Sequence, residues 1–369
     1  MNRVGVAAVV VGCGLASVGE VVAGDTTYDI GGRVSPQVAV TTYPDNSAFR
    51  DIFGSSSTSS AIDARVVFGL QHDRWSFDVD YQLVGVYAER LEFTRELPEE
   101  LRILFPHLPD DRTRLFDLTH VITDSGKTAA LQRLDRLAVG HTSDHLVMKF
   151  GRQAISWGNG LIYTVMDIFN PFDPAAVDKE YKTGDDMLYG QWLRGNGDDL
   201  QGVMVFRRDP FSGDVEADQG SLALKYHHMA SISEYDALVA QHYGDTLVGA
   251  GVNYSIGGAV WRGDLAVTFT DHDTVASLVT SLSQSWTWGG TNVSGVAEYF
   301  YNGFGQSDGC YSPTCLAGNA DLVERVARGE IFTLAQHYVA VSAMIEVHPL
   351  FLLTPNVFVN VADPSALLQ

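Results

Sequence analysis

The chain has 369 residues, enough for one large domain or for two or three ordinary ones. Its 45 Asp and Glu outnumber its 24 Lys and Arg, and the formal net charge of −21 excludes nucleic acid as a partner. Apolar residues make up 46% of the chain, a share that suits a globular core and equally a sheet with one apolar and one polar face.

Residues 1–24 have the pattern of a secretory signal peptide. Arg3 precedes an apolar stretch over 4–18, and small residues follow it before the first acidic residue of the next segment. A basic start, a short apolar region and a small-residue exit are typical of an exported protein. We expect cleavage near Ala23 or Gly24.

Two other interpretations of the N-terminus stay open. The stretch could be a buried strand, although the flanking charge disfavours this. Cys13 follows Val-Val-Gly, a weak lipoprotein context, but the apolar stretch continues past it. We therefore expect residues 25–369 to form the mature protein.

The mature region alternates apolar and polar residues again and again. Residues 75–83 read Trp-Ser-Phe-Asp-Val-Asp-Tyr-Gln-Leu, with every odd position apolar. This period of two predicts strands with one apolar face. Several runs, such as 74–88 and 274–288, exceed the roughly five to six residues of an ordinary strand. The apolar stretches after the signal are too short for a membrane helix of roughly 18 or more residues, so any membrane crossing must use strands.

The connections between the expected strands sort by length. Every second connection is a tight turn, such as Gly289-Gly290, whereas the alternate set contains all the long ones. Short turns at one end and long loops at the other are typical of outer-membrane barrels. We expect fifteen strands, near 27–42, 60–71, 74–88, 130–140, 145–157, 186–194, 199–208, 219–229, 232–242, 245–255, 259–271, 274–288, 291–304, 331–347 and 349–361.

The fold class is therefore all-β: a transmembrane antiparallel up-and-down β-barrel. Such barrels have an even number of strands, and the residues from Ala366 begin a sixteenth. We expect at least 16 strands, with 16–18 in a complete protein, and a barrel that is C-terminally incomplete here. A short helix is expected over 98–105, within a long outer loop.

A motif over 151–171 adds a resemblance. It consists of Gly-Arg-Gln at the end of a strand, then Trp-Gly, then Asn-Pro in the following loop. The motif resembles that of poorly characterised outer-membrane porin-like barrels, broadly similar to alginate-export proteins. The resemblance implies a large monomeric barrel with an infolded loop, whereas the net charge of −21 argues against a polyanionic substrate. The matching residues are Gly151, Arg152, Gln153, Trp157, Gly158, Asn170 and Pro171.

The loop 158–185 is the candidate constriction. It is long, aromatic and charged, as functional loops often are. It could fold into the lumen and set selectivity through its charges, or it could pack as an extracellular cap, and both interpretations stay open. Its candidate residues, with Trp157 just before it, are Trp157, Asp167, Asp173, Lys179, Glu180 and Lys182.

Alternation also predicts which strand residues face the lumen. Inward charges of both signs could orient a permeating solute, or they could only pair and solvate a wet interior. Arg152 is the strongest single candidate, because an arginine within a strand must face water or a carboxylate. The candidates on strands are Arg65, Asp78, Asp80, Arg152, Arg262 and Asp264, and alternation also places Asp63, Gln82, Lys225 and Glu298 on the inward face.

Cys310 and Cys315 flank a Ser-Pro turn and predict a loop-closing disulfide in an exported protein. We expect no metal site, no cofactor and no catalytic residues.

The predicted function is passive diffusion of small hydrophilic solutes across the outer membrane. The expected partners are outer-membrane lipid, lipopolysaccharide and the solutes, with a monomer or a homotrimer as the assembly. The alternatives are a substrate-specific exporter, an uptake barrel for hydrophobic compounds, and a structural or adhesive barrel.

Overall fold

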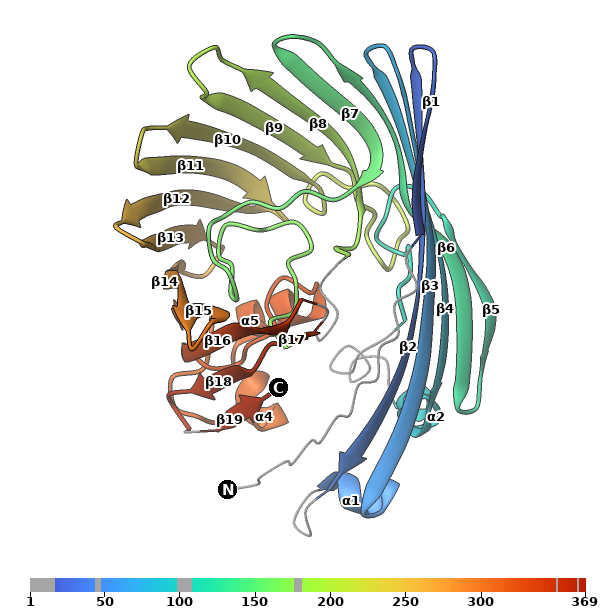
Figure 1. Cartoon of the computed structure of the whole chain (residues 1–369). Helices are drawn as coiled ribbons and strands as arrows, with labels where there is room; N and C mark the ends of the chain where they lie inside the picture. Colours follow the sequence, from blue (N-terminus) through green and yellow to red (C-terminus); the bar gives the residue numbers. More distant parts are fainter. Residues whose placement is uncertain (1–16, 44–47, 98–107, 176–180, 350, 364) are drawn as a thin grey trace.

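The computed structural model describes residues 17–43, 48–97, 108–175, 181–349, 351–363 and 365–369. Figure 1 shows a single, strongly curved sheet that wraps around a central space. Within the described ranges this sheet has nineteen strands. They are β1 (Ser17–Ala23), β2 (Thr26–Thr42), β3 (Ser56–His72), β4 (Trp75–Ala88), β5 (Thr119–Ser125), β6 (Thr128–Thr142), β7 (Leu146–Gln153), β8 (Asp185–Leu193), β9 (Asp199–Val205), β10 (Ser221–Met229), β11 (Ser233–His242), β12 (Asp245–Ile256), β13 (Ala259–Phe269), β14 (Thr274–Trp288), β15 (Thr291–Tyr301), β16 (His337–His348), β17 (Phe351–Leu353), β18 (Asn356–Asn360) and β19 (Ala366–Leu368).

The topology is up-and-down, because almost every strand pairs antiparallel with the next one along the chain. There are two exceptions among the described strands. Strand β6 pairs with β4 along one edge and with β5 and then β7 along the other. Strand β16 pairs with β15 along one edge and with β17 and β18 along the other. In the described part of the chain, β1 pairs with β2 alone and β19 with β18 alone. The sheet is therefore not closed between β1 and β19. The strand number and the topology confirm the predicted all-β, up-and-down architecture with at least 16 strands.

The two ends of the sheet differ. Tight turns such as Gly289-Gly290, with φ of 59° and 87°, lie at one end, where positive φ suits the two-residue hairpin turns that glycine permits. The long connections lie at the other end, together with the two-residue turns 126–127 and 243–244, and they carry four described helices. None of these helices is long and apolar enough to cross a membrane. They are α1 (Ala48–Phe53), α2 (Glu89–Glu96), α4 (Pro313–Leu316) and α5 (Ala320–Ala327).

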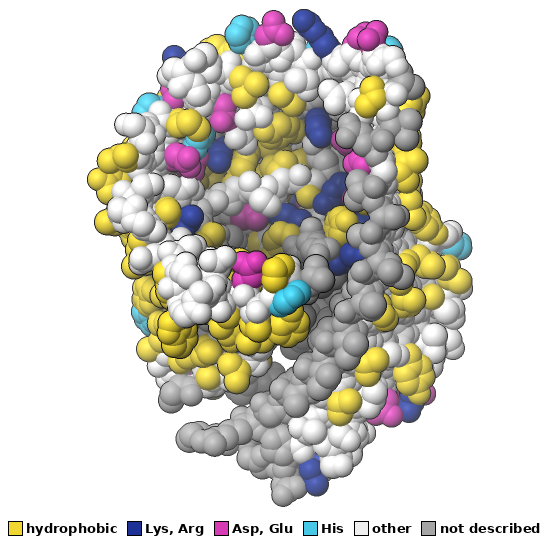
Figure 2. Space-filling model, viewed as in Figure 1, with side chains coloured by type: hydrophobic (Ala, Val, Ile, Leu, Met, Phe, Trp, Pro, Cys, Tyr) yellow, Lys and Arg dark blue, Asp and Glu magenta, His cyan; other side chains and the backbone are white. Residues whose placement is uncertain are grey.

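The two faces of the sheet have opposite polarity. On the convex face, apolar side chains such as Val66 and Leu222 are 52% and 57% exposed. On the concave face, the neighbouring Arg65 is only 5% exposed, and Asp264 has no exposed surface. Figure 2 shows charged side chains within the hollow and apolar ones along the outer flanks. This pattern is the reverse of a water-soluble protein, which buries its apolar face.

Several expected boundaries are wrong. Strand β7 ends at Gln153 instead of continuing to 157, because the chain turns inward there. Strand β16 begins at His337, and the stretch predicted as one strand over 349–361 is divided into β17 and β18. Pro355 separates these two strands, since proline lacks the N–H that a continuous ladder requires.

Two strands were not expected. β5 lies within the predicted long loop before 130. β1 falls within residues 17–23 of the expected signal peptide, where a strand was the alternative interpretation. Cleavage of the signal remains a prediction. The helix expected over 98–105 falls outside the described residues, and α2 precedes it.

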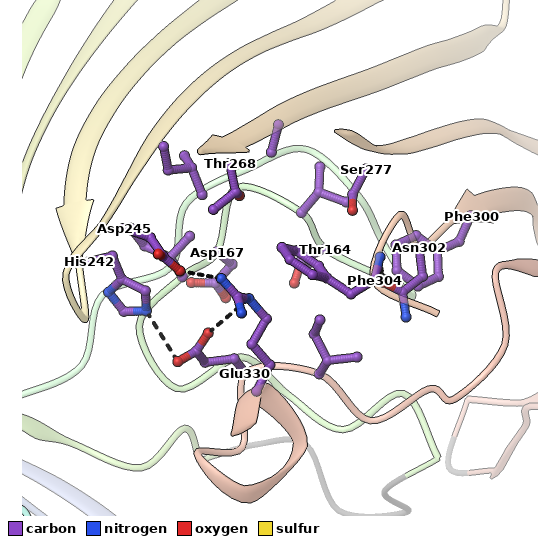
Figure 3. A pocket seen from close by; sticks show the side chains of 16 residues that line it. Thr164, Asp167, His242, Asp245, Thr268, Ser277, Phe300, Asn302, Phe304 and Glu330 are labelled. Carbon is purple, nitrogen blue, oxygen red and sulfur yellow. Dashed lines mark hydrogen bonds and ion pairs between the residues drawn. The ribbon is translucent and has the colours of Figure 1, made fainter. Parts of the chain in front are cut away.

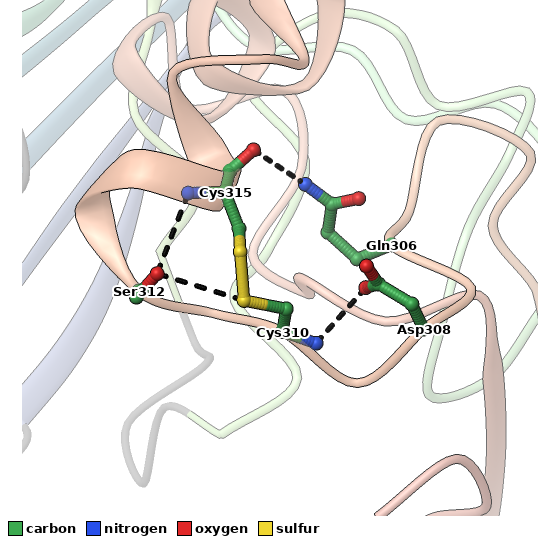
Figure 4. Close-up of a disulfide and its surroundings, with 5 residues drawn as sticks. All are labelled: Gln306, Asp308, Cys310, Ser312 and Cys315. Carbon is green, nitrogen blue, oxygen red and sulfur yellow. Dashed lines mark hydrogen bonds between the residues drawn. A yellow bond between two sulfur atoms is a disulfide. The ribbon is translucent and has the colours of Figure 1, made fainter.

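The predicted disulfide between Cys310 and Cys315 is confirmed, with a Cα–Cα distance of 5.9 Å. It closes a short turn that leads into α4 (Figure 4). Gln306 Nε2 donates to the carbonyl oxygen of Cys315 at 3.1 Å, which ties this turn to the start of the β15–β16 loop, residues 302–336.

Candidate functional site

The connection between β7 and β8 enters the space enclosed by the sheet (Figure 1). We call residues 154–184 the β7–β8 loop; its residues 176–180 are not described. Its buried hydrophobic side chains pack against the concave faces of β8 to β13, so it lies inside the curve of the sheet. The contacts that hold it there define the candidate site.

Asp264 of β13 provides the first anchor. Its carboxylate accepts hydrogen bonds from the backbone N–H groups of Asn159 at 2.5 Å and Gly160 at 3.2 Å. The Asn159 side chain also donates to Asp264 at 2.7 Å. Gly251 on β12 makes room for this contact, because a Cβ there would lie 2.5 Å from Asn159 Nδ2.

Glu298 of β15 provides the second anchor. It accepts from three successive backbone N–H groups, those of Leu161 at 2.9 Å, Ile162 at 3.1 Å and Tyr163 at 2.6 Å. Successive N–H groups that converge on one anion form a favourable nest for a carboxylate. Both acidic side chains therefore bind the loop backbone and are largely withdrawn from solvent.

Apolar contacts continue the docking. Tyr163 stacks on Phe300 with ring centroids 4.8 Å apart. Trp157 packs edge-on against Phe169 and donates from Nε1 to Gln201 Oε1 at 2.7 Å. The tryptophan N–H is thus satisfied while its ring is buried, as buried tryptophans require.

The end of the β7–β8 loop contacts the opposite wall. The guanidinium of Arg65 on β3 lies 4.1 Å from the ring centroid of Tyr181, and that of Arg33 on β2 lies 5.1 Å from it. Arg136 of β6 donates to the carbonyl oxygen of Lys182. Because 159–163 contacts β13 and β15, the loop spans the enclosed space from one wall to the other.

Lys182 and Asp167 join the two limbs of the loop. Lys182 Nζ donates to the Asp167 carboxylate and to the carbonyl oxygen of Ile155. Burial raises the pKa of Asp167, and the Lys182 ammonium opposes this rise. Burial likewise lowers the pKa of Lys182, and Asp167 opposes that change. A pair this deeply buried fixes the loop's shape and offers little charge to a solute.

A second network of charges lines β3, β4 and β6. Arg65 pairs with Asp135 at 2.9 Å and approaches Asp80 at 3.6 Å. Arg133 adds a contact to Asp135 at 3.2 Å. The predicted inward candidates Arg65 and Asp80 are therefore brought together, and both are largely buried.

Arg152 faces carboxylates, one of the two environments expected for an arginine within a strand. It has no exposed surface, and it pairs with Asp186 and Asp111, each at 2.9 Å. It also donates to the carbonyl oxygen of Phe116. A side chain without exposed surface presents no charge to a solute, so Arg152 instead holds segment 108–118 against the ends of β7 and β8.

Other candidates keep more solvent access. Asp78 pairs with Lys149 at 3.1 Å, and their side chains are 40% and 37% exposed. Arg262 donates to Ser283 at 2.6 Å, and Asp173 accepts from the backbone of its own turn. Lys179 and Glu180 lie outside the described residues.

Sequence reasoning missed part of the site. Asp111, Arg133, Asp135 and Asp186 carry much of the buried ion pairing, yet none of them was predicted to form it. Leu131, Arg133 and Asp135 lie two residues apart and therefore share one face of β6. The alternation of this strand could have predicted that Arg133 and Asp135 face inward. The role of Asn159 could not be predicted from the sequence, because its partner Asp264 is 105 residues away along the chain.

Comparisons with known proteins give the following. No family model matches the chain, and no curated protein matches it. Solved structures similar to it include OccAB1 of Acinetobacter baumannii (9% identity, TM-score 0.47, covering 91% of this chain and 80% of that one). A mutant porin of Rh. blastica has 10% identity and a TM-score of 0.45, covering 95% of this chain and 97% of that one. Salmonella typhi OmpF in complex with daunomycin has 9% identity and a TM-score of 0.45, covering 94% of each chain.

Proposed function

We propose that the protein is an outer-membrane, porin-like channel for the diffusion of small hydrophilic solutes. The observation that carries this proposal is the reversed polarity of the sheet. Exposed apolar side chains on the convex face suit lipid, and the charged concave face suits a water-filled interior. The confinement of the long loops to one end of the sheet supports the same function.

The β7–β8 loop acts as the constriction. It is anchored on β13 and β15 at 159–163 and contacts β2 and β3 through Tyr181. A segment held at both walls narrows any path through the enclosed space. Its shape, fixed by buried contacts, then limits the size of the solute.

The charges of this interior favour neutral solutes. The buried acids Asp264 and Glu298 bind the loop backbone. The cations Arg65, Arg152 and Lys182 pair with carboxylates. Because paired charges produce little net field, discrimination by size and hydrogen bonding outweighs discrimination by charge.

The proposal also includes three predictions that rest on the sequence and not on the contacts described above. They are export through a cleaved signal peptide, contact with lipopolysaccharide, and a monomeric or trimeric assembly. The motif over 151–171 resembles that of alginate-export-like barrels, but the net charge of −21 disfavours alginate itself.

The test is conductance of the refolded full chain in a planar bilayer. We expect stepwise, ohmic single-channel currents that carry salt ions of both signs. No current at any voltage or salt concentration would contradict the channel function and favour a structural or adhesive barrel. Current blocked by one solute class at low concentration would favour a substrate-specific exporter or uptake barrel.

A further inference from the structure

A cavity lies between the β7–β8 loop, the concave face of the sheet and the β15–β16 loop (Figure 3). Its volume is about 70 Å³. A water molecule needs roughly 10–15 Å³ on this measure, so the space suits a ligand of about five or six non-hydrogen atoms. Strands β11 to β15 contribute to its walls, as does Arg325 of α5.

Two polar atoms of residues that line the cavity lie side by side without a hydrogen-bond partner. They are Nε2 of His242, a residue only 7% exposed, and Oε1 of Glu330, and they lie 3.7 Å apart. That distance is too long for a direct hydrogen bond. Buried polar groups are normally satisfied, so two orphaned atoms at one cavity point to a missing ligand.

The charges beside this pair are already compensated. Arg325 donates to Asp245, and the Asp167 carboxylate that also lines the cavity binds Lys182. A charged ligand would add an unpaired charge to a confined site, which is costly. The cavity therefore selects a neutral ligand.

We propose that this cavity binds a small neutral polyol, of about the size of glycerol, with one hydroxyl that bridges His242 Nε2 and Glu330 Oε1 from the cavity side. A hydroxyl both donates and accepts, so a single oxygen satisfies both orphaned atoms. The hydroxyl-bearing Thr164, Thr268 and Ser277 surround the same space, and they meet the remaining hydroxyls of the ligand.

The assignment holds for either tautomer of His242. Its Nδ1 lies 2.8 Å from Ser221 Oγ, which can donate or accept. If Nε2 carries the hydrogen, the ligand hydroxyl accepts from it and donates to the Glu330 carboxylate. If Nε2 is bare, the hydroxyl donates to it and accepts from a protonated Glu330. Burial raises the pKa of Glu330 to about 7, so both forms of this carboxyl are populated near neutrality.

The inference extends the proposed function, but binding to the cavity needs no open channel. Its test is therefore made on the detergent-solubilised full chain by saturation-transfer NMR with glycerol at pH 7. We expect saturable transfer to glycerol, with acetate and trimethylammonium competing at least tenfold more weakly. Failure of conductance with glycerol binding intact would contradict the channel and leave this inference standing.

Matched variants locate the site. Glu330→Leu removes the acceptor, together with the ion-pair contacts of Glu330 to Arg325 and Arg328, each at 3.9 Å, whereas Thr268→Val leaves those contacts in place. We expect Glu330→Leu to weaken glycerol binding at least tenfold. Thr268→Val removes a hydroxyl that lines the cavity from β13, and we expect it to weaken glycerol binding as well. Glu324→Leu makes the same change on an exposed side chain of α5, which pairs with Arg328 outside the cavity lining, and is expected to bind as the wild type does.

Three outcomes would overturn the proposal. The first is the absence of saturable transfer in the wild-type chain, which would mean that the cavity holds water only. The second is wild-type affinity in both Glu330→Leu and Thr268→Val. The third is equal competition by the size-matched ions, which would contradict a neutral ligand.

Discussion

Asp264 and Glu298 differ from the acidic side chains expected on the wall of an aqueous channel. They have 0% and 2% exposed surface, and between them they accept five backbone hydrogen bonds from residues 159–163. Hydrogen bonds to a charged group stabilise by roughly 1.5–3 kcal/mol each. The alternation of polar residues correctly predicted that Asp264 faces inward, but alternation cannot show whether an inward carboxylate meets water or protein.

The double variant Asp264→Asn and Glu298→Gln should loosen the β7–β8 loop. Its neutral side chains accept fewer and weaker bonds, so we expect higher and noisier single-channel conductance, together with faster amide exchange at 159–163. Asp271→Asn, an exposed change in the turn after β13, is the control and should match the wild type. Unchanged exchange at 159–163 in the double variant would contradict the anchoring role.

Glu330 gives the site a pH dependence. Burial raises the pKa of its carboxyl from 4.5 to about 7, against the opposing charges of Arg325 and Arg328. The folded state therefore holds the proton more tightly than the unfolded state. Its contribution to stability is complete below about pH 4.5 and is lost as the pH rises through about 7.

We expect the unfolding temperature of the wild type to fall as the pH rises from 5 to 8. Glu330→Gln cannot titrate, so this part of the fall should disappear in it. Thermal melts of the two chains across that range measure the difference, with Glu324→Gln as the exposed control from α5. Parallel curves for wild type and Glu330→Gln would show that Glu330 is not the group responsible.

The disulfide acts at the level of one element, the β15–β16 loop. Cys310 and Cys315 close a ring over a sequence separation of 5, and chain-entropy arguments assign such a short ring roughly 2 kcal/mol. Replacing both residues with serine should speed amide exchange over 306–320 and leave exchange in β12 and β13 unchanged. Exchange equal to that of the wild type over 306–320 would mean that Gln306 and its neighbours hold the turn without the disulfide.

The elements differ in how far the sequence predicts them. Strands such as β4 and β14 carry long alternation and were expected within a residue or two. β5 was missed because six of its seven residues are exposed, so it has no buried face to give a period. The contacts of the β7–β8 loop could not be foreseen either, since Asn159 meets Asp236 and Asp264 only after the six strands β8 to β13 have curved the sheet around it.

At the scale of the whole molecule, the decisive property is the environment of the convex face. Val239, in the middle of β11, is 49% exposed, and Ile232, in the turn before that strand, is 54% exposed. In water these two positions are equivalent, and a surface arginine at either would change stability little. In a bilayer they differ, because Val239 lies near the middle of its strand and Ile232 lies at the end of the sheet.

Arginine at these two positions therefore tests the orientation of the whole fold. In lipid vesicles we expect Val239→Arg to lower the free energy of unfolding by about 2–4 kcal/mol and Ile232→Arg by about 0–1 kcal/mol. The difference arises because a lipid-facing arginine costs most near the bilayer midplane and little near its surface. Denaturant titration of the refolded chains measures both values. If the two variants lose the same small amount, the convex face does not meet hydrocarbon, and the channel proposed from its polarity is wrong.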